Sequence, residues 1–88
     1  MNNLITVEEV VVDIIDNMSE ADKTEVIHTA EKDLIAFHHG WGRQIRNQYK
    51  LWQNTKLVKA TGTTHPDDAS GVIMKSVWEA LREKESYQ

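Results

Sequence analysis

Apolar residues recur with a helical period at the start of the chain. Between residues 7 and 18 they follow the spacing i, i+3, i+4, i+7, i+8, i+11, which puts one side of an α-helix in contact with a core: Val7, Val10, Val11, Ile14, Ile15 and Met18. Thr6 and Glu9 have the spacing of a capping box, in which each side chain accepts a hydrogen bond from the other residue's backbone N–H. The pattern predicts a helix that begins near Val7. Ser19 is placed to cap a short second helix that buries Val26.

A longer helix is predicted in the middle of the chain, from near Ala30 to about Asn47. Its apolar line consists of Leu34, Phe37, His38, Trp41, Ile45 and then Gln48 or Tyr49. Gly40 and Gly42 interrupt this helix, and each glycine costs about 1 kcal/mol in a helix interior. Either another element therefore crosses close to the two glycines, or the helix bends there.

The last third of the chain predicts a turn and two further helices. We expect residues 47–53 to form a turn that folds Leu51 and Trp52 onto the body, followed by a short helix around residues 56–60 that ends at Gly62. Pro66 suits the first position of a final helix, and the acidic residues after it suit the positive end of its dipole. The buried stripe of that helix is Ile73, Val77, Trp78 and Leu81.

These elements predict an all-α fold, a compact small bundle of three main helices plus one or two short helices. The 88 residues are enough for one domain, residues 1–88, with a core of about residues 6–83 and a polar tail at residues 84–88. Cysteine is absent, which excludes a disulfide framework and indicates a reducing, cytoplasmic compartment. The longest apolar run, residues 34–37, is far shorter than a membrane helix, so we expect a soluble protein without a membrane segment.

Charge is distributed unevenly along the chain. The net charge is −4, yet residues 1–33 carry nine carboxylates and only two lysines. Residues 34–64 contain no acidic residue and hold five of the ten cationic side chains together with four aromatic residues. An acidic first segment is thus joined to a basic and aromatic centre. Such opposite charges can favour docking of the acidic segment on the basic one or head-to-tail contact between copies, and the acidic segment can also engage a basic partner protein.

Three blocks of sequence resemble a known family. They are Gly42-Arg43-Gln44-Ile45-Arg46-Asn47, then Leu51-Trp52, and then His65-Pro66-Asp67-Asp68-Ala69-Ser70-Gly71. Their order is similar to that of a small, mostly bacterial domain family of unknown function with I-R-N, L-W and H-P-D-D-x-S-G blocks. The resemblance extends from roughly Val7 to Leu81. It implies a helical fold and no assigned activity.

Two roles are open for the cations of the central block. In the structural one, Arg46 reaches Asp67 or Asp68 and fixes the last helix onto the central one, as a buried ion pair can. In the other, a basic and aromatic surface binds phosphate, a nucleotide or single-stranded nucleic acid, with arginine as an anion clamp and aromatic rings as stacking surfaces. The candidate residues of that surface are Arg43, Arg46, Asn47, Lys50, Tyr49 and Trp52.

Histidine, serine and tryptophan are the other residues that could carry chemistry in this chain. His38, His65 and Asp67 are weak candidates for a metal site, because their spacing is not that of a zinc motif. We expect His38 to be a buried, hydrogen-bonded histidine and His65 to be a capping residue. Ser70 lacks the glycine elbow and the base of a hydrolase. The three tryptophans, Trp41, Trp52 and Trp78, are expected to pack against one another in the core.

The function expected from the sequence is binding without catalysis, and no cofactor is expected. The partner is another protein or a second copy of the chain, and a bacterial or phage accessory protein fits the size and charge. The alternative is the phosphate, nucleotide or single-stranded nucleic-acid binder described above.

Overall fold

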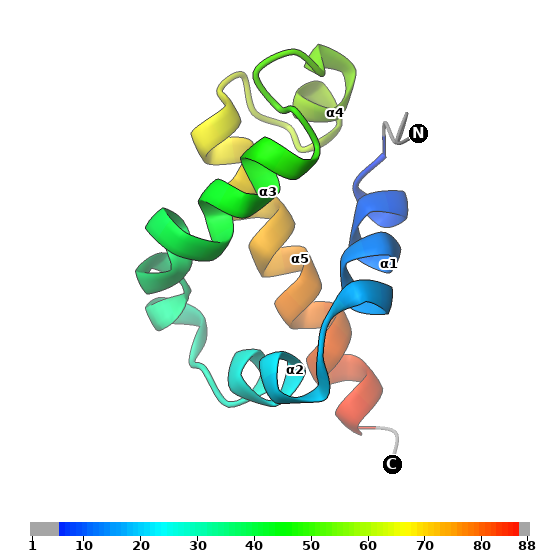
Figure 1. The fold of residues 1–88 in the computed structure, drawn as a ribbon, viewed down its shortest axis with the longest axis vertical. Coiled ribbons are helices and arrows are strands. Elements are labelled where there is room, and N and C mark those ends of the chain that lie inside the picture. Colours follow the sequence, from blue (N-terminus) through cyan, green and yellow to red (C-terminus); the bar gives the residue numbers. More distant parts are fainter. Residues whose placement is uncertain (1–5, 87–88) are drawn as a thin grey trace.

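The computed structural model describes residues 6–86, and all regular structure within that range is helical (Figure 1). The elements are α1 (Val7–Asn17), α2 (Glu20–Ile27), the 3₁₀ helix η1 (Glu31–Phe37), the π-helix η2 (His38–Gly42), α3 (Arg43–Gln48), α4 (Thr55–Ala60) and α5 (Pro66–Ser86). Because η1, η2 and α3 follow one another without a break, they form one central segment. The predicted all-α class, with three main helical segments and two short ones, is confirmed.

Both predicted N-terminal caps are present. At the start of α1, the backbone N–H of Glu9 donates to Thr6 Oγ1 at 3.2 Å, and the backbone N–H of Thr6 donates to the Glu9 carboxylate at 3.2 Å. At the start of α2, the backbone N–H of Asp22 donates to Ser19 Oγ at 3.1 Å. These bonds satisfy backbone donors that lack a partner inside the helix, so the first turns are fixed locally.

The central segment changes its winding where the two glycines lie. The predicted span of residues 30–47 agrees with the observed one, but a single α-helix was the wrong expectation, since Gly40 and Gly42 fall in the π turn η2. Gly42 is buried, and a Cβ there would lie 3.3 Å from Arg46 Nη1 and 3.5 Å from Met74 Sδ of α5. The close crossing of α5 therefore explains this glycine. Gly40 is exposed, and a Cβ there would meet nothing within 4 Å.

The C-terminus of α3 is closed by a Schellman motif. Lys50 takes the left-handed conformation with φ 52°, and the backbone N–H of Leu51 donates to the Arg46 carbonyl at 3.0 Å. This turn directs Leu51 into the core, where it is 1 % exposed. The expectation that Trp52 also folds onto the body is wrong: it follows the inward-facing residue, points outward and is 61 % exposed.

Helix α5 is the element on which the others pack. It contacts α1, α2 and all three parts of the central segment, and it runs through the middle of the molecule (Figure 1). Its inner positions are completely buried, and they belong to one core cluster with residues of α1, α3 and α4: Val10, Ile14, Ile45, Leu57, Val58, Ala69, Ile73 and Val77. The core is thus built around one long helix rather than between layers.

The final helix is longer than predicted. It remains helical to Ser86, so the polar tail expected from Lys84 is part of α5 as far as the structure describes it, and residues 87–88 lie outside the described range. Within residues 6–86, no helix combines the length and the apolar character needed to span a bilayer.

The two glycines of η2 provide a matched test of this packing. Gly42→Ala should unfold at a lower urea concentration than Gly40→Ala, with a difference in unfolding free energy of about 1–2 kcal/mol, because only the first methyl group displaces the Arg46 guanidinium and Met74. Both substitutions gain the same helix propensity, about 0.5–1 kcal/mol, so it cancels in the comparison. Equal midpoints would show that α5 does not restrict position 42.

Candidate functional site

Arg46 joins the central segment to the first turn of α5. Its guanidinium is buried, with Nη1 donating to Ser70 Oγ at 3.0 Å and Nε 3.4 Å from the Asp67 carboxylate. Ser70 Oγ in turn donates to the backbone carbonyl of Asp67 at 2.8 Å, and Ser70 is 0 % exposed. A buried guanidinium is stabilised only when its donors are paired in this way. Asp68 is exposed, and within the described residues Arg46 pairs with Asp67 instead.

Tyr49 makes a second buried contact between segments that are distant in sequence. Its ring is 5 % exposed, and its hydroxyl donates a hydrogen bond to the carboxylate of Asp13 on α1. Burial first, and then the hydrogen bond and negative charge of Asp13, raise the pKa of the Tyr49 phenol above its ordinary value. This bond connects the end of α3 to α1.

The structure separates the six residues proposed for anion binding. Arg46 and Tyr49 face inward and are engaged by Ser70, Asp67 and Asp13. The remaining four are exposed: Arg43, Asn47, Lys50 and Trp52. Arg43 and Arg46 therefore do not form a two-guanidinium clamp. Trp52 instead lies against the His65 ring, with ring centroids 5.4 Å apart.

The histidines are dispersed as well. His65 Nδ1 accepts the backbone N–H of Asp67 at 3.1 Å, as a residue that caps α5 would. His38 is half-buried and lies against His39 at a ring distance of 5.5 Å, so the expectation of a buried histidine is wrong. Within residues 6–86, no group of three or more histidine, aspartate or glutamate side chains is placed to hold a metal ion.

The tryptophans do not pack against one another, contrary to the prediction. Trp41 pairs with Phe37, whereas Trp52 is exposed beside His65. Trp78 is half-buried, donates its indole N–H to the Thr29 carbonyl at 2.7 Å, and lies under the Arg82 guanidinium. Small aliphatic side chains fill the centre of the bundle, so the indoles lie at its margins, where their N–H groups can be solvated or paired.

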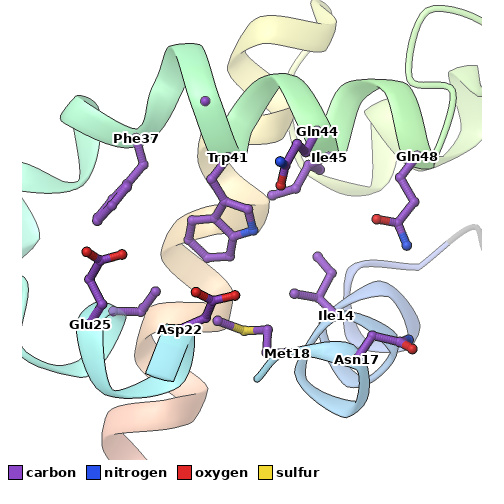
Figure 2. A pocket seen from close by; sticks show the side chains of 12 residues that line it. Ile14, Asn17, Met18, Asp22, Glu25, Phe37, Trp41, Gln44, Ile45 and Gln48 are labelled. Atoms are coloured by element: carbon purple, nitrogen blue, oxygen red, sulfur yellow. The ribbon is translucent and has the colours of Figure 1, made fainter. Parts of the chain in front are cut away.

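A groove lies between the central segment on one side and α1 and α2 on the other (Figure 2). Both sides pack mainly on α5 and contact each other little, which leaves a cavity of about 370 Å³ between them. Its apolar wall consists of Ile14, Met18, Val26, Phe37, Trp41 and Ile45. Its polar lining consists of Asn17, Asp22, Glu25, Gln44 and Gln48. The backbone of Gly40 also lines the cavity.

The groove is acidic. Asp22 and Glu25 rise from α2 toward Trp41 and Phe37, which point down from the central segment (Figure 2). No lysine, arginine or histidine is among the residues that line it. Glu20 of the same helix, by contrast, is paired with Lys23 at 3.2 Å. The groove therefore presents unneutralised negative charge next to an apolar wall.

Sequence patterns did not identify this groove, although one signal was present. Asp22 precedes Val26 by four residues and so lies on the same face of α2, while Glu25 follows Asp22 by three residues and lies at the edge of that face. The two carboxylates therefore border the side of α2 that faces the body of the protein. Phe37 and Trp41 have the i, i+4 spacing that brings two rings together on a helical segment.

Comparison with known proteins gives one result. A family model described as a domain of unknown function, DUF6794, matches residues 5–81. No curated protein and no solved structure matches the chain. The matched range contains both the Arg46 contact and every residue that lines the groove.

Removal of the Arg46 side chain should lower stability in the absence of any ligand. We expect Arg46→Ala to reduce the unfolding free energy by about 2–4 kcal/mol, because Ser70 keeps a buried hydroxyl without its donor and a buried volume is left empty. The half-exposed Asp67 adds little to this loss. Urea unfolding followed by tryptophan fluorescence measures the change. The control is the exposed Arg43→Ala, which should stay within about 0.5 kcal/mol of the parent, and an unchanged midpoint for Arg46→Ala would refute a structural role.

The Tyr49 contact predicts a specific dependence of stability on pH. A folded-state pKa above the unfolded value stabilises the protein fully below about pH 10, and this contribution is lost as the pH rises further. Tyr49→Phe should therefore be less stable than the parent by about 1–2 kcal/mol near pH 8. The gap should narrow above pH 10, when measured by urea unfolding at each pH. A gap that stays constant would mean that the phenol is not held in its neutral form.

Proposed function

Since the chain belongs to the DUF6794 family, a domain of unknown function, we propose its function from the groove: it is a non-catalytic module that binds another protein. The groove receives a segment of that partner that carries apolar and basic side chains. The observation that supports this proposal is the lining itself, an apolar wall with two carboxylates and no cation.

The chemistry of the lining favours such a partner over others. Apolar side chains gain free energy when they leave water for the wall formed by Trp41, Phe37 and Met18, at about 25 cal/mol per Å². Asp22 and Glu25 attract cations and repel anions, which orients the partner and excludes acidic segments. The volume of about 370 Å³ holds a few side chains, as the centre of an interface does.

A catalytic role has less support from the same structure. Ser70, the one serine weighed as a nucleophile, is completely buried, and its hydroxyl already accepts from Arg46 and donates to a backbone carbonyl. A nucleophile must be able to reach its substrate and must have a base within hydrogen-bond distance. We therefore favour binding without catalysis, and without a cofactor.

The phosphate or nucleotide alternative is weakened by the position of Arg46. Anion recognition through the central segment requires a guanidinium that is free to form two parallel bonds, whereas that of Arg46 is buried against Ser70 and Asp67. The exposed Arg43 and Lys50 remain as solvated cations. Nucleotides and short single strands therefore belong in a binding experiment as competitors, and a stabilising effect of either would favour the alternative.

The setting that we infer is that of a bacterial or phage accessory protein in a reducing cytoplasm. The inference is based on the small size, the absence of cysteine and the negative net charge of −4. An acidic binding surface on a small accessory protein suits a basic partner whose contacts it occupies.

A reversal of charge at the groove should invert the preference for peptides. We expect a helical leucine–lysine peptide to bind the parent and the matching leucine–glutamate peptide not to bind, as measured by calorimetry at low and high salt. Asp22→Lys should weaken the basic peptide roughly tenfold, since it replaces attraction by repulsion beside an apolar wall. Glu8→Lys is the matched control, because Glu8 also lies in the first turn of a helix but does not line the groove.

The outcomes of this experiment are distinct. Equal binding of both peptides, or equal weakening by the two variants, would contradict a charge-selective groove. Sedimentation of the protein alone separates a partner protein from a second copy. A concentration-dependent dimer that Asp22→Lys abolishes and Glu8→Lys retains would assign the groove to a second copy of this chain.

A further inference from the structure

We propose that the end of the groove next to α2 is a subsite for a single alkylammonium group, the side chain of a lysine on the partner. This inference rests on the proposed protein-binding function and specifies the residue that the groove recognises. It is carried by four side chains that line one cavity: Phe37, Trp41, Asp22 and Glu25.

The aromatic pair forms a corner. The rings of Phe37 and Trp41 have centroids 6.1 Å apart and planes at 88° to each other. Both rings are only half-buried, so part of each remains open to the groove. Two perpendicular rings offer a negative π surface to a cation, an interaction that is strongest with tryptophan and is typical of sites for alkylated ammonium groups.

The carboxylates face this corner from the opposite wall. Asp22 and Glu25 are three residues apart on α2, and their side chains extend toward Trp41 and Phe37 (Figure 2). Neither carboxylate forms an ion pair or a side-chain hydrogen bond within the described part of the chain. Both carboxylates are exposed, and a cation placed between them and the rings is attracted by the two carboxylates and by the π surface.

Structural roles explain the two carboxylates only in part. Asp22 lies in the first turn of α2 and complements the helix dipole there, but the cap itself uses its backbone N–H, which donates to Ser19. Glu25 lies beyond that turn, so the dipole does not account for it. The exposed Glu31 shows the usual arrangement, because its carboxylate pairs with Lys75 at 3.1 Å.

The rest of the groove suits the stem of the same side chain. Val26, Met18 and Ile14 belong to the apolar wall of the same cavity. A lysine side chain buries its methylene stem along such a wall while its charged end is held by carboxylates. The indole N–H of Trp41 lies in the same cavity and reports on occupancy, since the nitrogen points into the groove in Figure 2.

The experiment uses n-butylammonium as the probe, added to the ¹⁵N-labelled full chain at constant ionic strength up to about 50 mM, a range that covers millimolar affinities. The Trp41 indole N–H signal should shift and saturate. The indole signal of Trp78, which is bonded to the Thr29 carbonyl, should not move. Asp22→Asn with Glu25→Gln should raise the apparent Kd at least about fivefold, and Glu8→Gln should leave it unchanged. The spectrum of each variant confirms its fold.

Neutral and anionic probes of the same length test the charge requirement. Butanol and butyrate should shift the Trp41 signal much less than butylammonium does, and an equal shift with butanol would overturn the subsite. An unmoved Trp41 signal would overturn it too. Suppose that butylammonium gives either of these results, while the basic peptide still binds and Asp22→Lys still weakens peptide binding. In that case only the lysine subsite is refuted. If the peptide also fails to bind, the proposed function fails with it.

Discussion

The arrangement of this protein depends on the burial of one guanidinium. Arg46 lies between the central segment and the first turn of α5, where Ser70 and Asp67 satisfy its donors. A cation in that position is tolerated only while its partners stay in place, so the contact fixes both the distance and the register of the two segments. Gly42 is the companion requirement, because a side chain there would occupy the space that the guanidinium takes. Gly42 and Arg46, four residues apart, thus set how closely α5 approaches the central segment.

The groove follows from the same arrangement. Because α5 is the common support for α1, α2 and the central segment, the segments on its two sides need little contact with each other. Polar contacts then fix the borders of the open space. Tyr49 binds Asp13 on one side, and Trp78 and Arg82 bind the backbone at the end of α2 on the other. The lining of the groove is thus already arranged in the free protein, which lowers the cost of ordering this protein when a partner binds.

Local signals in the sequence predicted most of the fold. The caps at Thr6 and Ser19, the proline that starts α5 and the helical period of α1 each act within a few residues, and all are present in the structure. The two glycines of the central segment indicated a close crossing or a bend there, but the π winding and the identity of the crossing helix were not predictable, because α5 is distant in sequence. The groove was missed for a related reason. The groove exists because α1 and α2 stay apart from the central segment there. The periodicity of apolar residues predicts which side chains are buried, but it does not predict where two segments stay apart.

The basic centre and the acidic first segment of the sequence have different roles in the structure. In the basic centre, one cation is withdrawn from solvent and serves packing, while Arg43 and Lys50 stay solvated and contribute little. In the acidic front, Asp22 and Glu25 are exposed beside aromatic rings and form no ion pair within the described residues. Water solvates them in the free protein, and they attract a cation that enters the groove. The carboxylates of the groove, rather than the more conspicuous arginines, are therefore what our proposal of a binding site is based on.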